Sequence, residues 1–180
     1  VAVCPNIQPA TCVRALQRPS NWIYHQYFLK SLKAKLRKKS RLYPGQWNLA
    51  RLPSIRTMWE FDEVYTAPDG GYRDAADYYE KCAALNCLAS ITIPTLIITA
   101  QDDRFIPYDM FTEPSLHSNP WIHLMAPTHG GHCGFFQRPS QHEDPFWAEN
   151  RIIDFIRIHE GPANKPVSHT VYPQPLQSTK

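Results

Sequence analysis

Two short polar segments of the chain contain the residue types that acid–base catalysis uses. Asp102 and Asp103 directly follow a run rich in β-branched residues. Further along, His129, His132 and Cys133 lie among glycines, which would let the backbone turn sharply around His132. A serine hydroxyl is a poor nucleophile until an imidazole accepts its proton, and that imidazole needs a carboxylate to hold its tautomer. An acidic segment followed by a histidine segment therefore predicts two members of a Ser-His-Asp triad.

The residues around these segments predict a parallel sheet. Ile91–Ala100 is a continuous run of the kind found in strands covered on both faces. Trp121–Met125 is a second strand candidate, and Tyr108–Ser118 between them is long enough for a crossover helix. Val1–Cys4 is a further buried strand candidate. Because ligands and catalytic groups of such sheets lie at the carboxyl ends of the strands, we expect both polar segments there.

Helical patterns fill most of the remaining chain. The longest helix would start at an Asn21 cap and run to about Ser40. Its apolar residues are spaced to share one broad face, made of Trp22, Tyr27, Phe28, Leu32 and Leu36.

Shorter segments complete the pattern. Ile55–Phe61 and Arg73–Cys82 favour short helices, whereas Ala67–Gly71 favours a loop. Asp144 and Pro145 suit the N-cap and first position of a helix that runs through Ile158. Strands that alternate with helices in this way indicate the α/β class with a parallel sheet.

Four motifs, spread over roughly residues 1–157, carry a family resemblance. They are Val1-Ala2-Val3-Cys4-Pro5; Glu60-Phe61-Asp62-Glu63-Val64-Tyr65-Thr66-Ala67-Pro68 with Gly71-Tyr72 and Tyr78-Tyr79; Ala100-Gln101-Asp102-Asp103; and Gly130-Gly131-His132-Cys133-Gly134-Phe135. The chain that contains them resembles the C-terminal part of the YheT-type, embryogenesis-associated α/β-hydrolases, a group of predicted esterases and lipases. The second motif makes the resemblance specific, because hydrolases in general do not share it.

The resemblance implies both a domain plan and a pair of site residues. It implies that residues 1–160 form the C-terminal portion of an α/β-hydrolase sheet, with a helical lid insertion at about 13–90. Residues 161–180 are polar and proline-rich, and we expect a disordered tail there. In the family pattern the catalytic acid falls on Asp103 and the histidine on His132. Arg104 replaces the usual proline, and Asn6 and Ile7 depart from the usual continuation of the first motif, but no catalytic group is lost.

The family's serine is absent from these 180 residues. None of the seven glycines forms the G-x-S-x-G turn that carries the nucleophile in this fold. The opening Val1–Pro5 is typical of an interior strand, so we expect the serine on a missing N-terminal half of the same fold. The resemblance thus implies a carboxylic-ester hydrolase for hydrophobic esters, represented here by a chain that is inactive alone.

A basic segment leaves a second interpretation open. Seven Lys and Arg residues occur between Lys30 and Arg41. We favour the solvated outer face of a lid helix whose aromatic side covers the site. The alternative is a non-catalytic remnant that binds a partner or an anionic membrane surface through this helix.

Composition and cysteine spacing indicate the cellular compartment and the classes of ligand to expect. Net charge is +3, which does not indicate a nucleic-acid partner. Five cysteines without a C-x-x-C pair suit a reduced compartment, so we expect a cytoplasmic protein with peripheral membrane contact. The H-x-x-H-C spacing from His129 to Cys133 could be taken for a zinc site, but no second Cys/His cluster lies nearby. We therefore expect neither a metal nor an organic cofactor.

Overall fold

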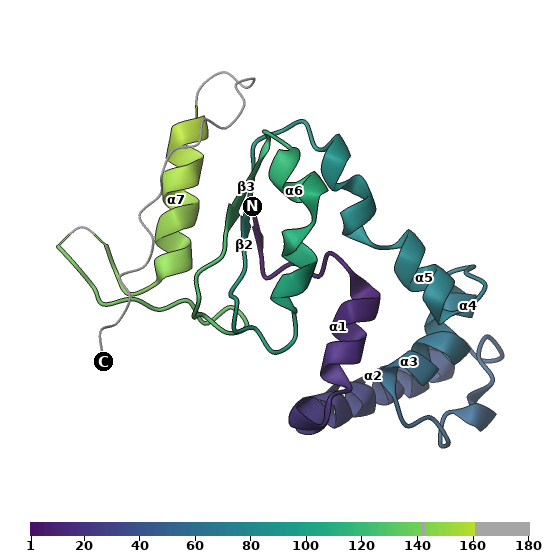
Figure 1. The fold of residues 1–180 in the computed structure, drawn as a ribbon. Helices are drawn as coiled ribbons and strands as arrows, with labels where there is room; N and C mark the ends of the chain where they lie inside the picture. Colours follow the sequence, from purple (N-terminus) through teal and green to yellow (C-terminus); the bar gives the residue numbers. More distant parts are fainter. Residues whose placement is uncertain (142, 161–180) are drawn as a thin grey trace. The chain divides into compact units, whose positions relative to one another are not determined.

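The chain forms two compact units in a computed structural model that describes residues 1–141 and 143–160 (Figure 1). One unit combines Val1–Ile7 with the described residues from Ala84 onward and contains the sheet. The other unit, Gln8–Ala83, is helical. The tail predicted for residues 161–180 lies outside the described residues. No helix among the described residues is long and apolar enough to cross a membrane.

Three parallel strands form the sheet, in the order β1 (Ala2–Val3), β2 (Thr95–Ile98), β3 (Ile122–Met125). Val3 pairs with Ile98, which pairs with Met125 on its other side. The side chain of Ile98 is fully buried at the centre of the sheet. This confirms the predicted α/β class and the parallel sheet. It also brings the carboxyl ends of the three strands to one edge.

Strand β2 is shorter than the β-branched run that predicted it. It begins only at Thr95, because Pro94 has no N–H to donate and lies at the strand's entrance. Ile93, just before the proline, is exposed, whereas every residue from Leu96 to Ala100 is buried. A 3₁₀ segment, η4 (Ala84–Ser90), precedes this part of the chain.

Helical segments flank the sheet. A 3₁₀ turn, η5 (Tyr108–Thr112), and a short helix, α6 (Pro114–Ser118), connect β2 to β3. The last helix, α7 (Trp147–His159), lies on the other side of the strands from α6 (Figure 1). Its Trp147 and Phe155 are buried.

The predicted start of the last helix was wrong. Asp144 does not cap it; its Oδ1 instead accepts the backbone N–H of Phe146 at 2.9 Å. Phe146 itself is held in an antiparallel bridge with Phe136 and has non-helical backbone angles, φ -91° and ψ 78°. The helix therefore begins at Trp147, because the residues before it pair with another part of the chain.

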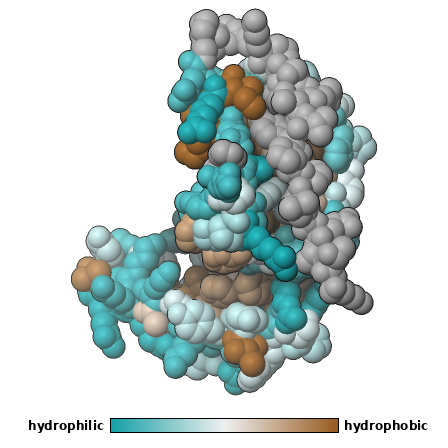
Figure 2. Space-filling view, turned by 90° about the vertical axis from the view of Figure 1, so that its left-hand side faces the viewer, coloured by the Kyte–Doolittle hydropathy of each residue, from teal (hydrophilic) through white to brown (hydrophobic). Residues whose placement is uncertain are grey.

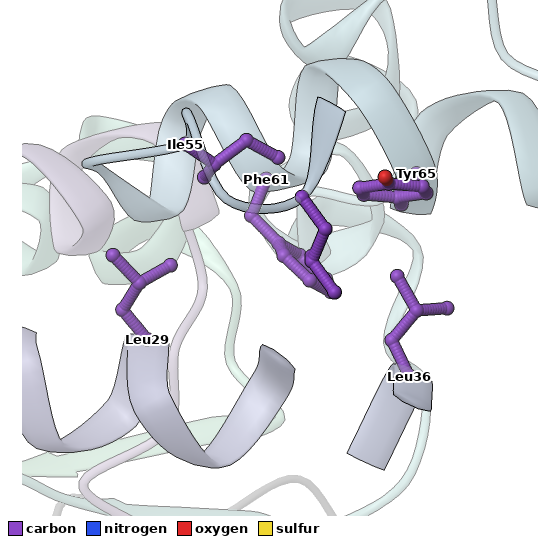
Figure 3. Close-up of a cluster of buried hydrophobic side chains, with 6 residues drawn as sticks. Leu29, Leu36, Ile55, Phe61 and Tyr65 are labelled. Atoms are coloured by element: carbon purple, nitrogen blue, oxygen red, sulfur yellow. The ribbon is translucent and has the colours of Figure 1, made fainter. Parts of the chain in front are cut away.

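The helical unit contains seven short or medium segments and one long helix. They are α1 (Pro9–Leu16), η1 (Pro19–Asn21), α2 (Trp22–Leu42), η2 (Leu49–Arg51), α3 (Met58–Phe61), η3 (Asp62–Thr66), α4 (Ala67–Asp69) and α5 (Ala75–Lys81). Its main core packs residues of α2 against the segment from Leu52 to Tyr65. Figure 3 shows Leu29 and Leu36 of α2 pointing toward Ile55, Phe61 and Tyr65.

The loop predicted at Ala67–Gly71 begins three residues late, at Gly70. Thr57 and Glu60 form a capping box at the start of α3, and the helical backbone then continues through a π turn, η3, into α4. Ala67 is completely buried, which holds it in the helix. The chain then turns at Gly71, whose φ of 76° is accessible to glycine without strain.

The predicted buried face of α2 was wrong in its first two turns. His25, Leu29 and Leu36 are the buried residues of this helix. Trp22 and Tyr27 keep 61% and 71% of their surface exposed. The apolar residues of the first turns lie on several sides of the helix. Periodicity alone therefore could not show which of them pack against the rest of the helical unit. Figure 2 shows further exposed hydrophobic residues, in brown, among hydrophilic ones.

A buried hydrogen bond within the helical unit gives a test of its packing. Tyr79 donates its hydroxyl to Asp62 Oδ2 at 2.5 Å, and both residues are buried. Tyr79→Phe would leave the Asp62 carboxylate short of a donor, which costs about 1–3 kcal/mol of the free energy of unfolding. Urea denaturation followed by circular dichroism measures the change. Tyr43→Phe, at an exposed position, is the matched control and should be nearly silent; equal effects of the two substitutions would contradict the packing described.

Candidate active site

The sheet positions an acidic turn directly after β2. Asp103 follows the buried Thr99 and Ala100, and its own side chain is completely buried. Asp103 Oδ1 accepts the backbone N–H groups of Phe105 at 2.8 Å and Ile106 at 3.1 Å. Oδ1 thereby stabilises the turn, and Oδ2 points toward the segment that follows β3.

Glycines position the histidine segment after β3. A Cβ atom at Gly130 would come within 2.4 Å of the Phe135 ring, so only glycine fits there without movement of that buried ring. Gly131 has a φ of 53°, and the Gly134 N–H closes the turn on the Gly130 carbonyl at 2.9 Å. This tight turn presents His132 at the carboxyl edge of the sheet.

The structure brings the two predicted site residues together. His132 Nδ1 lies 2.9 Å from Asp103 Oδ2. The His132 side chain remains 42% exposed, whereas that of Asp103 is inaccessible. The edge of the Phe105 ring also packs against the imidazole, with the two ring centres 5.2 Å apart. The imidazole is therefore held by a buried carboxylate on one side and is open on another.

This arrangement suits general base catalysis. With its Nδ1–H donated to Asp103, a neutral His132 ring carries its lone pair on Nε2. Nε2 can then accept a proton from a nucleophile, and the buried carboxylate stabilises the imidazolium that results.

The neighbouring Asp102 has a different environment. Asp102 Oδ1 accepts the Gly131 N–H at 2.8 Å, and its Oδ2 lies 3.3 Å from His129 Nδ1. Partial burial works to raise the pKa of the Asp102 carboxyl, but the hydrogen bonds from Gly131 and His129 outweigh it and lower that pKa. Asp102 thus fastens the histidine segment to the acidic turn.

Two cysteines lie next to His132, and the analysis of motifs missed the approach of one of them, Cys4. Cys4 Sγ, Cys133 Sγ and a ring nitrogen of His132 all lie within 4.8 Å of one another. Burial raises the pKa of the Cys4 thiol to about 12. The zinc interpretation of the sequence grouped His132 and Cys133 with His129, which instead contacts Asp102. Cys4 and Cys133 are distant in sequence, and the parallel pairing of β2 with both β1 and β3 brings them together.

Comparisons with curated proteins find relatives that are named as hydrolases. The chain is 38% identical over 150 residues to the Escherichia coli protein named "Putative esterase YheT", a match that covers 82% of the chain and 44% of that relative. It is 32% identical to mouse phospholipase ABHD3, over 70% of the chain and 31% of the relative. It is 31% identical to the monoacylglycerol lipase of Saccharomyces cerevisiae, over 59% of the chain and 23% of the relative.

The chain spans less than half the length of these relatives. No protein-family model matches it. No solved structure matches it significantly.

The tautomer of His132 tests the geometry of the pair. In the unaltered chain the neutral ring should carry its proton on Nδ1, because Asp103 can only accept. Asp103→Asn offers an amide N–H to Nδ1, so the proton should move to Nε2. Nitrogen-15 chemical shifts of the neutral ring distinguish the two forms. Asp102→Asn is the matched control and should leave the His132 tautomer unchanged. If Asp103→Asn left the His132 tautomer unchanged, the proposed hydrogen bond between Asp103 and His132 Nδ1 would be contradicted.

Proposed function

The chain belongs to the YheT-type α/β-hydrolase family, and on that premise we propose that it supplies the acid and the general base of a carboxylic-ester hydrolase. The observation that carries the proposal is the 2.9 Å contact between the buried Asp103 carboxylate and the accessible His132 ring. The names of the relatives, which include esterases, a phospholipase and a lipase, support ester bonds as the substrate class.

In the proposed mechanism His132 acts twice on a serine outside this chain. Nε2 first takes the proton of the serine hydroxyl as that oxygen attacks the ester carbonyl. The protonated ring then gives that proton to the leaving alcohol, and an acyl-serine remains. Water, deprotonated by the same nitrogen, releases the acid and restores the serine. Asp103 holds the ring in position and stabilises its cation at each step.

The nucleophile is assigned to a segment outside the 180 residues, because they contain no G-x-S-x-G sequence. Such a segment would also supply part of the oxyanion hole. The role of the helical insertion as a lid stays a prediction, as does the cytoplasmic location.

A cavity within the helical unit, taken by itself, has the character of a site for a hydrophobic group. It has a volume of about 420 Å³, within the usual range for small-molecule sites. Most of its lining is apolar or aromatic and includes Leu32, Leu36, Phe61, Tyr65 and Tyr78. An acyl chain would be desolvated there. Of the charged residues in the lining, Lys39 forms an ion pair with Asp69 at 3.0 Å, and Lys35 adds a further positive charge.

Exposed aromatic residues favour a second candidate function for α2. Trp22, Ile23 and Tyr27 keep 61%, 73% and 71% of their surface exposed, and the basic segment follows on the same helix. Aromatic residues beside Lys and Arg are typical of helices that lie in the interface of an anionic membrane. We therefore also propose peripheral membrane binding through α2.

Vesicle binding tests this second candidate. The chain should bind vesicles of mixed zwitterionic and anionic phospholipid, but not purely zwitterionic ones, and added salt should weaken binding. Arg37→Gln with Lys38→Gln removes two charges, worth about 1 kcal/mol each near an anionic surface, so affinity should fall roughly 30-fold. Arg138→Gln with Arg157→Gln, which removes two charges from the other unit, should have little effect. Equal losses for both double variants would exclude α2 as the binding element.

Ester hydrolysis tests the main proposal. The protein extended to include the serine-bearing segment should hydrolyse a short-chain chromogenic ester, whereas the 180-residue chain should not. In the extended protein His132→Ala and Asp103→Asn should each lower kcat by about 10⁴-fold or more. Asp102→Asn, which keeps the His132 contact, should cost less than about tenfold. Turnover by the 180-residue chain that serine reagents abolish would overturn the assignment of the nucleophile.

A further inference from the structure

Two thiols converge on His132 from different parts of the sheet edge. Cys4 directly follows β1 and is 5% exposed, whereas Cys133 is exposed in the histidine segment. Both sulfur atoms and a ring nitrogen of His132 lie within 4.8 Å of one another. Among the described residues, Cys4 and Cys133 are also the only non-glycine residues with positive φ, at 45° and 66°. Such backbone angles are costly for side chains with a Cβ, and they place the two thiols side by side.

The three side chains match the ligands of a soft or borderline divalent cation. Tetrahedral zinc binds sulfur at about 2.3 Å and imidazole nitrogen at about 2.0–2.1 Å, which separates neighbouring ligand atoms by about 3.5–3.8 Å. Atoms already within 4.8 Å need to approach one another by about 1.3 Å at most. Cys133 and His132 are exposed, so their side chains have room to move and leave a path for the ion.

Asp103 completes the surroundings of such a site. Metal-bound histidines commonly donate their other ring N–H to a carboxylate, which orients the ring and raises its basicity. The 2.9 Å contact of Asp103 with Nδ1 provides this and leaves Nε2 as the nitrogen for the ion. Three protein ligands leave a fourth position of the tetrahedron open.

We propose that Cys4, Cys133 and His132 bind a thiophilic divalent cation, with Zn²⁺ as the type, and that the bound ion inhibits the hydrolase. Binding depends only on the geometry of these three residues, whereas inhibition rests on the function proposed above. The physical reason is that the Nε2 lone pair can bind either the ion or the proton of the serine. The ion is therefore a competitor of the catalytic proton at a single atom.

Cobalt spectroscopy tests binding on the 180-residue chain itself. Co²⁺ added to the reduced chain should give thiolate-to-cobalt charge transfer and the intense visible bands of a tetrahedral site, and one equivalent of Zn²⁺ should abolish them. Cys133→Ala, at an exposed position, should weaken Co²⁺ binding on the order of 100-fold. Cys4→Ala and His132→Ala should do the same, with circular dichroism as the check on folding.

Matched controls separate this site from other thiols and histidines. Cys87→Ala removes an exposed thiol outside the cluster, and His129→Ala removes the histidine of the H-x-x-H-C spacing. Both should retain the full cobalt spectrum. A spectrum lost with His129→Ala but kept with Cys4→Ala would overturn the proposed ligand set, and no thiolate band in the unaltered chain would overturn the site.

Inhibition is tested on the extended protein. For each variant, the rate of ester hydrolysis with Zn²⁺ is compared with the rate of the same variant in the presence of a chelator. Zn²⁺ should inhibit ester hydrolysis, and Cys133→Ala should raise the inhibitory concentration on the order of 100-fold. If the protein binds Co²⁺ but hydrolyses no ester, the proposed function fails and the binding site stands. If it hydrolyses esters that Zn²⁺ does not affect, and no cobalt spectrum forms, the metal proposal fails and the hydrolase stands.

Discussion

The position of every polar group in the site depends on the parallel pairing of β2 with both of its neighbours. Beyond the strands themselves, the pairing continues through hydrogen bonds from Cys4 N–H to Ile98, from Thr99 N–H to Met125, and from Gln101 N–H to the Pro127 carbonyl. These bonds bring three turns to one edge. A slip of β3 by one residue would turn its side chains to the opposite face and carry the histidine segment away from Asp103.

The central strand and the acid–histidine pair could be predicted because their signals are local. A long β-branched run allows a strand covered on both faces, and Pro94 marks where it can begin. Glycines around His132 indicate a tight turn, and this signal does not depend on the rest of the fold. The choice of Asp103 over Asp102 required the family resemblance. In the structure the two carboxylates differ in partners: Asp103 holds His132, whereas Asp102 holds the backbone of Gly131.

Features set by distant contacts could not be predicted. The start of α7 depends on the bridge between Phe136 and Phe146, and no local cap signal reveals that pairing. The exposed first turns of α2 follow from which stripe meets Ile55 and Phe61, since apolar residues there surround the helix. Cys4 and Cys133 lie far apart in the sequence of the sheet-bearing unit, and only the folded sheet brings their thiols together.

Catalysis and metal binding, as proposed, converge on one nitrogen atom, His132 Nε2, whose partner in the hydrolase is a serine outside this chain. The most direct measurement is to label the extended protein with a fluorophosphonate and locate the modified residue by peptide mass spectrometry. The account predicts a single modified serine, within G-x-S-x-G and N-terminal to Val1, and loss of labelling in His132→Ala. A label on a serine of the 180 residues, or undiminished labelling of His132→Ala, would contradict it.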